Sequence, residues 1–134
     1  MNTRYLMSLS AAFLAMLGVG ITFLPQELIA YVGAPSDGTV VLLMQMLGAL
    51  YLGFAMLNWM NREGHIGGIY RRPVSMANFL NFVIGGAALV KWVIAEQFAF
   101  EVAAMALIYS VFGVWFGLVL FTHPDNETQS RSDR

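Results

Sequence analysis

"YLMSLSAAFLAMLGVGITFL" (residues 5–24) runs for twenty residues without a charged side chain. At about 1.5 Å per residue, a helix of this length is about 30 Å long, which matches the hydrocarbon core of a bilayer. Three further apolar stretches follow it, at residues 39–60, 74–95 and 102–121. Lipid offers the backbone no hydrogen-bonding partners, so each stretch is predicted to be a helix. The sequence therefore predicts an all-α integral membrane protein, an antiparallel bundle of four transmembrane helices.

The composition agrees with a membrane location. Hydrophobic residues make up 58% of the 134 residues and charged residues only 11%, whereas a soluble domain carries about a quarter charged residues. The net charge of -1 leaves no basic surface for nucleic acid, and the absence of cysteine excludes disulfides and thiolate metal sites. One transmembrane domain is predicted over residues 1–122, followed by a polar, disordered cytoplasmic tail over residues 123–134.

The positive charges predict the orientation of the helices. Short cytoplasmic loops of membrane proteins are enriched in Lys and Arg. With a cytoplasmic N-terminus, the inner side carries six basic residues and the outer half carries only Lys91. The six inner residues are Arg4, Arg62, Arg71, Arg72, Arg131 and Arg134. Both termini are therefore predicted to be cytoplasmic. A secretory signal peptide is the alternative for the first stretch, but its apolar region is usually about 7–15 residues long.

The segment between the first two apolar stretches, "PQELIAYVG" (residues 25–33), predicts a short helix at the outer interface. Pro25 suits the first helical position, and Glu27 suits the positive N-terminal turn. Gly33 suits the C-terminal cap. The connection between the last two stretches, residues 96–101, is short, so these helices are predicted to form a tight hairpin. Pro73 suits the first turn of the third long helix, directly after Arg71 and Arg72.

Small residues recur within the apolar stretches, where they let helix backbones approach closely. Ser110, Gly113 and Gly117 form such a series in the last stretch. Packing within one chain is the first interpretation, and a homodimer interface through these three residues is the alternative. Gln45 is interpreted as a hydrogen-bonding residue between packed helices.

Three asparagines lie within the apolar stretches, at positions 58, 78 and 81. An amide is costly in hydrocarbon, so these side chains must face one another, water or a ligand. Hydrogen bonding between helices, with Ser8 or Ser10 at a similar depth to Asn58, is the structural interpretation. The functional interpretation is a small inner-leaflet cavity for a ligand. Its predicted residues are Asn58, Asn78 and Asn81, with Arg62, Arg71 and Arg72 at its mouth.

Other polar residues form no recognisable catalytic set. No nucleophile, base and orienting group stand in a familiar pattern, and no phosphate-binding glycine motif occurs. His65 and His123 have no second ligand at a recognisable spacing, so neither a metal site nor any cofactor is predicted.

The order of "FLPQELIAYVGAP" (residues 23–35) and "QMLGALYLGFAMLNW" (residues 45–59) resembles the small four-helix membrane proteins of the DoxX-like and DUF4345-like groups. The resemblance rests on a pattern of proline, acidic, leucine and glycine residues. It implies a four-helix bundle of the bacterial inner membrane and no particular reaction.

Three functions remain open from the sequence. The first is a non-enzymatic membrane protein that serves as an accessory or interaction module. The second is a carrier or binding protein for a lipophilic or anionic small molecule, held in the asparagine-lined cavity. The third is an integral membrane enzyme.

Overall fold

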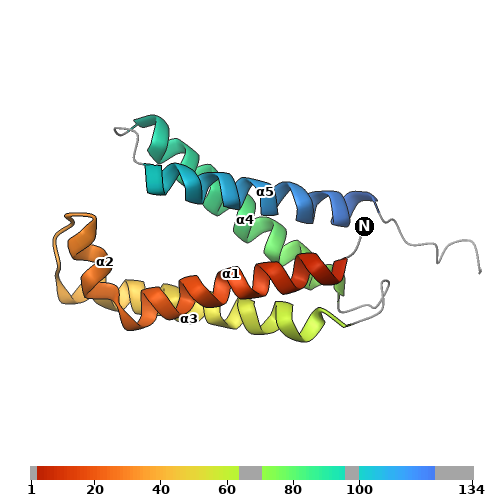
Figure 1. Cartoon of the computed structure of the whole chain (residues 1–134), viewed down its shortest axis with the longest axis horizontal. Helices are drawn as coiled ribbons and strands as arrows, with labels where there is room; N and C mark the ends of the chain where they lie inside the picture. The colour runs from red at the N-terminus through yellow and green to blue at the C-terminus, as the bar shows by residue number, and fades with distance from the viewer. Residues whose placement is uncertain (1–2, 64–70, 96–99, 123–134) are drawn as a thin grey trace, which may run out of the picture. The chain divides into compact units, whose positions relative to one another are not determined.

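The computed structural model describes residues 3–63, 71–95 and 100–122, and over these residues the chain forms five helices and no strand. Four of the helices are long and apolar enough to cross a membrane (Figure 1). The five helices are α1 (Thr3–Phe23), α2 (Pro25–Tyr31), α3 (Gly38–Asn61), α4 (Arg71–Ala95) and α5 (Phe100–Thr122). Over these residues the predicted all-helical structure, with four helices long and apolar enough to span a membrane, is confirmed, and each long helix begins and ends within three residues of its predicted limits. The predicted tail, residues 123–134, lies outside the described residues.

Contacts divide the chain into two compact units. The first unit is Met7–Glu63, which contains α2, α3 and all of α1 beyond its first turn. The second unit combines Met1–Leu6 with Gly64–Arg134 and contains α4 and α5. The four-helix antiparallel bundle over residues 1–122 stays a prediction.

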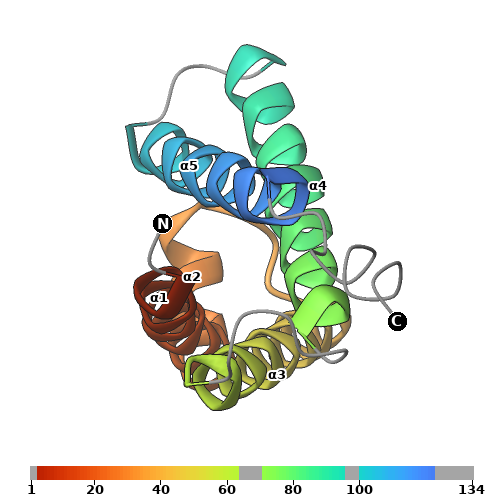
Figure 2. The ribbon, with the colours of Figure 1, turned by 90° about the vertical axis from the view of Figure 1, so that its right-hand side faces the viewer.

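In the first unit, α1 and α3 pack through glycines. A Cβ atom built on Gly48 would lie 2.8 Å from the backbone nitrogen of Thr22 and 2.9 Å from the carbonyl oxygen of Gly18. A Cβ atom on Gly18 would lie 2.8 Å from Cγ of Leu52. No side chain larger than hydrogen fits at these two positions without a shift of the backbone. Figures 1 and 2 show the two helices side by side.

The connection between α1 and α3 contains the predicted short helix. Pro25 is its first residue, as expected from its fixed φ and missing N–H group. Gly33 follows the helix with a φ of 68°, a left-handed conformation that glycine adopts without steric cost. The backbone N–H of Ala34 then donates to the carbonyl of Ile29 at 3.1 Å, which closes the helix as a Schellman motif does. The helix and its first residue, Pro25, are confirmed; Val32 is the C-terminal cap, and Gly33, which was predicted to be the cap, follows it in the left-handed conformation. The position of the helix at a membrane interface stays a prediction.

In the second unit, α4 and α5 pack against each other in antiparallel directions. A Cβ atom on Gly85 would lie 2.8 Å from the ring of Tyr109. Six residues earlier on α4, the ring of Phe79 lies 3.1 Å from a Cβ atom built on Gly117, which is eight residues later on α5. The two helices therefore form a hairpin in which glycines receive aromatic rings.

Phe82 is the centre of this hairpin and is fully buried. Its ring stacks on Phe112 and Phe116, with ring centroids 4.9 Å and 5.7 Å away. Tyr109 meets the same ring edge-on at 5.2 Å. Aromatic pairs at these distances stabilise beyond the burial of their area, by about 0.5–1.5 kcal/mol each. The core of the second unit is therefore aromatic.

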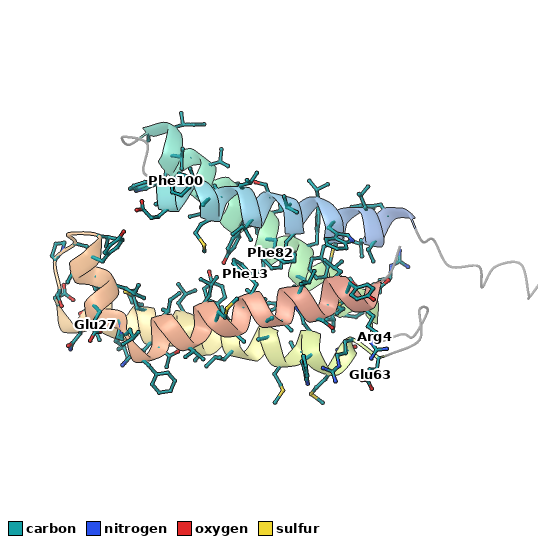
Figure 3. The ribbon with its side chains drawn as sticks, viewed as in Figure 1. Arg4, Phe13, Glu27, Glu63, Phe82 and Phe100 are labelled. Atoms are coloured by element: carbon teal, nitrogen blue, oxygen red, sulfur yellow. The ribbon has the colours of Figure 1, made fainter. Side chains whose placement is uncertain are left out.

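Large apolar side chains also cover the outside of all four long helices (Figure 3). Examples are Met16 on α1, Leu43 on α3, Ile94 on α4 and Leu107 on α5, which are between 60% and 79% exposed. Water disfavours an apolar surface of this extent, whereas lipid chains do not. The helices therefore suit contact with a lipid bilayer.

Candidate functional site

Asn58 is fully buried in the first unit and joins α3 to α1. Its Nδ2 donates to Oγ of Ser10 at 3.0 Å, and Oγ of Ser10 in turn donates to the carbonyl of Met7 at 3.1 Å. Ser10 is also fully buried. The predicted hydrogen bond between helices is thus present at Asn58, and Ser10 rather than Ser8 is its partner.

The two asparagines of α4 differ from each other. Asn78 is fully buried, and its Nδ2 donates to the carbonyl of Val74, one turn earlier in the same helix, at 2.8 Å. Asn81 lies three residues further on, and its Nδ2 is buried with no hydrogen-bond partner among the described residues. A buried donor without a partner costs about 1–3 kcal/mol. Of the three asparagines, Asn81 would therefore gain most from a hydrogen bond to a ligand.

The three arginines of the predicted cavity mouth lie at helix ends. The guanidinium of Arg62 lies 3.4 Å from the centroid of the Trp59 ring and 3.3 Å from Oε1 of Glu63. Arg72 is exposed in the first turn of α4. Arg71 begins the same helix, and its side chain lies outside the described part of the structure. Arg62 is therefore occupied by contacts within its own helix end.

The predicted site residues fall into two sets. Asn58 and Arg62 belong to the first unit, and Asn78, Asn81, Arg71 and Arg72 belong to the second. In the first set Asn58 lies on α3 and Arg62 is the C-terminal cap of that helix, whereas all four residues of the second set lie on α4. A cavity formed by both sets stays a prediction.

The predicted dimer residues of α5 contact their own hairpin. A Cβ atom on Gly113 would lie 3.3 Å from Cγ2 of Val83, and one on Gly117 would lie 3.1 Å from Phe79. The hydroxyl of Ser110 donates to the carbonyl of Ala106 in the same helix at 2.8 Å. Packing within one chain is thus present at both glycines, and a homodimer through Ser110, Gly113 and Gly117 stays a prediction.

Thr22 is a polar residue that the sequence analysis did not single out. Its Oγ1 is buried with no hydrogen-bond partner among the residues that the structure describes, and it lies against Gly48 at the α1–α3 contact. A hydroxyl in the last turn of an apolar helix, paired with a glycine in the next helix, is the sequence signal for this contact.

Within residues 3–63, 71–95 and 100–122, no three His, Cys, Asp or Glu side chains lie close enough to hold a metal ion. His65 and His123, which the sequence analysis considered, lie outside those ranges.

Comparison with family models, curated proteins and solved structures found no match to this chain. The resemblance to the DoxX-like and DUF4345-like groups stays a prediction from the residues quoted above.

Proposed function

We propose that this chain is a non-enzymatic integral protein of a bacterial inner membrane, with both termini in the cytoplasm, which serves as an accessory or interaction module. The observation that carries the proposal is the apolar outer surface of four helices of membrane-spanning length. Such a surface contacts lipid and can also receive helices of other membrane proteins.

The bonding of the interior amides supports a structural rather than a chemical role for them. Asn58 is bonded to Ser10 across two helices, and Asn78 is bonded to Val74 within one helix. The bond between Asn58 and Ser10 joins two helices, and interhelical bonds of this kind contribute about 0.6 kcal/mol each on average. In this proposal the outward-facing apolar side chains are the groups that contact partners.

Membrane location and orientation are tested by extraction and reporter fusions. We expect the protein to stay with the membrane in alkaline carbonate, since four apolar spans hold it there. A reporter fused after Asp37 should be extracytoplasmic, and one fused after Glu63 should be cytoplasmic, because of the charge bias. Release by carbonate, or a cytoplasmic reporter at Asp37, would overturn the proposal.

The interaction role is tested by photo-crosslinking in cells. A photoreactive residue in place of Leu43, which is 60% exposed, should give adducts with membrane proteins. The matched control is the same residue in place of Leu14, which is fully buried in α1, and it should give none. Absence of protein adducts at Leu43 and at other exposed positions would remove the interaction role while leaving the membrane location intact.

A second candidate function is the binding of a lipophilic or anionic small molecule, and Asn81 is the observation that favours it. Its buried Nδ2 offers an unused donor to a carbonyl or other acceptor. Arg72 lies nine residues earlier on α4, which is about 13–14 Å along the helix axis. A ligand with an acceptor and a distant anionic group fits this spacing.

Replacement of Asn81 separates the two candidate functions. Without a ligand, Asn81→Leu should leave the free energy of unfolding unchanged or raise it by about 1–3 kcal/mol, because it removes a buried unpaired donor. With a ligand, the same variant should fold and lose the bound molecule in native mass spectrometry, while Arg72→Gln should weaken an anionic ligand more than a neutral one. Asn78→Leu is the control, since Asn78 already donates to Val74. A molecule retained equally by wild type and folded Asn81→Leu would refute the Asn81 site.

A further inference from the structure

The C-terminal end of α3 holds an arginine side chain in a defined position. The guanidinium of Arg62 lies 3.4 Å from the centroid of the Trp59 ring, and a cation within about 6 Å of an indole centroid is attracted by the face of the ring. Its Nε and Nη2 both donate to Oε1 of Glu63 at 3.3 Å. We call these three residues the Trp59 cluster. All three belong to one helix end, so their geometry is set within the first unit.

These contacts use only part of the guanidinium of Arg62. They take one face of the group and two of its three nitrogens, whereas Nη1 has no hydrogen-bond partner among the residues that the structure describes. The side chain of Glu63 is 64% exposed, and a carboxylate offers about four acceptor positions in all. The Trp59 cluster therefore presents a cationic donor and an anionic acceptor side by side, next to an indole ring that is 51% exposed.

The length of α3 gives the depth of the cluster in a membrane. Trp59 lies 21 residues after Gly38, the first residue of α3, which is about 31–32 Å along the helix axis. The hydrocarbon core is about 30 Å thick, and the charged Asp37 directly before Gly38 is disfavoured inside it. A span that starts after Asp37 therefore reaches the lipid headgroups at Trp59, the level at which membrane proteins are enriched in tryptophan.

We infer that the Trp59 cluster binds the headgroup of a phospholipid with a primary ammonium group, such as phosphatidylethanolamine, an inference that rests on the membrane location proposed above. The lipid phosphodiester accepts from Nη1 of Arg62, since guanidinium groups bind phosphate through charge-assisted hydrogen bonds. The lipid ammonium donates to the carboxylate of Glu63. The indole of Trp59 contacts the glycerol and the first carbons of the acyl chains. Each charge of the headgroup thus meets a protein charge of opposite sign.

Other phosphate-bearing ligands fit the cluster less well. The headgroup of phosphatidylglycerol is anionic and has no ammonium group, so Glu63 repels it while Arg62 attracts it. The quaternary ammonium of phosphatidylcholine has no N–H group to donate to Glu63. Inorganic phosphate lacks both an ammonium group and the apolar part that would contact Trp59. The adjacent opposite charges of Arg62 and Glu63 therefore favour the ethanolamine headgroup.

Fluorescence quenching by brominated lipids tests the inference at the site itself, because bromine quenches only a nearby indole. The chain has three tryptophans, so Trp92→Phe with Trp115→Phe leaves Trp59 alone. In phosphatidylcholine vesicles, brominated phosphatidylethanolamine should bind at Trp59 about two- to fivefold more tightly than brominated phosphatidylglycerol, the ratio expected from one exposed ion pair. The matched control leaves only Trp92, which is 44% exposed and follows the basic Lys91. It should show no such preference.

Substitutions in the protein with Trp59 alone test the two charged residues separately. Glu63→Gln should remove the preference for phosphatidylethanolamine, because the ammonium loses its partner and phosphatidylglycerol is no longer repelled. Arg62→Gln should weaken both lipids about two- to fivefold, since the phosphodiester is common to them. Glu27→Gln is the control, since it removes an exposed glutamate of α2, and it should leave the preference unchanged. If the proteins with one tryptophan fail to accumulate, native mass spectrometry of the wild-type chain and of Glu63→Gln, titrated with the two lipids, measures the same preference.

Three outcomes would overturn the inference. They are equal binding of the two lipids at Trp59, the same preference at Trp92 as at Trp59, and a preference that persists in Glu63→Gln. Quenching by both lipids without a preference rejects the headgroup site and agrees with the membrane location. Absence of quenching by any brominated lipid rejects the membrane location and the site with it, so failure of the inference and failure of the proposed function are distinguishable.

Discussion

The hydroxyl of Ser10 takes part in two hydrogen bonds in the first unit, one of them to another helix. It accepts from Asn58 and donates to the carbonyl of Met7. Both Asn58→Leu and Ser10→Ala should therefore destabilise the protein, and the double variant should cost less than the sum. We expect a coupling energy of about 0.6 kcal/mol, and at most about 1.7 kcal/mol. Unfolding titrations of the four proteins in a mild detergent measure this energy, and additive effects would show that the bond is absent.

Sequence reasoning at the residue scale reached the right residue types but not their bonds. It placed Asn58 and Ser10 at similar depth, because depth follows from counting along a span. It could not separate Asn78 from Asn81, since both are asparagines on one helix, three residues apart. One bonds to Val74 and the other has a buried Nδ2 without a partner among the described residues. That difference depends on side-chain rotamers and helix rotation, which are set by packing with other helices.

The contact between α1 and α3 depends on Gly48. In Gly48→Ala the new Cβ would lie 2.8 Å from the backbone nitrogen of Thr22, so the helices must move apart. We expect a loss of about 1–3 kcal/mol in the free energy of unfolding, as for other overpacked cores. In the control Gly20→Ala, the new Cβ meets no described atom within 4 Å, and the helix should gain up to about 0.5–1 kcal/mol. Thermal unfolding followed by circular dichroism compares the two, and equal stabilities would contradict the close contact.

At the scale of elements, most of the fold could be predicted from the sequence. Uninterrupted apolar runs set the limits of the four long helices, because a polar or charged residue at either end is disfavoured in hydrocarbon. The start of α3 at Gly38 also depends on Asp37, whose side chain accepts from the N–H of Val40 at 2.9 Å, a cap that the sequence analysis left out. Hydropathy does not say which helix a glycine faces. The packing of Gly113 and Gly117 against α4 therefore remained one of two alternatives until the structure placed it.

For the whole molecule, orientation follows from charge, and changing the charge should change it. Arg62, Arg71 and Arg72 supply half of the six basic residues predicted to lie on the inner side. Replacing all three by Gln and Asp37 by Lys leaves three basic residues inside against two outside. We expect a mixed population, with part of a reporter fused after Glu63 becoming extracytoplasmic. The control Glu27→Gln changes an acidic residue, which contributes little to orientation, and should leave the wild-type pattern. An unchanged reporter in the charge variant would show that some other feature sets the orientation.

The division into two units has a consequence for biosynthesis. The contacts of the first unit connect residues between Met7 and Glu63, so none of them waits for the later helices. At about 5–20 residues per second, the ribosome needs about 3–12 s to extend the chain from Glu63 to the end of α5. During that interval α1 and α3 have time to pack at Gly18 and Gly48 while α4 and α5 are still being made. The residues Thr3–Leu6, which belong to the second unit, must by contrast wait for the part of the chain that follows Glu63.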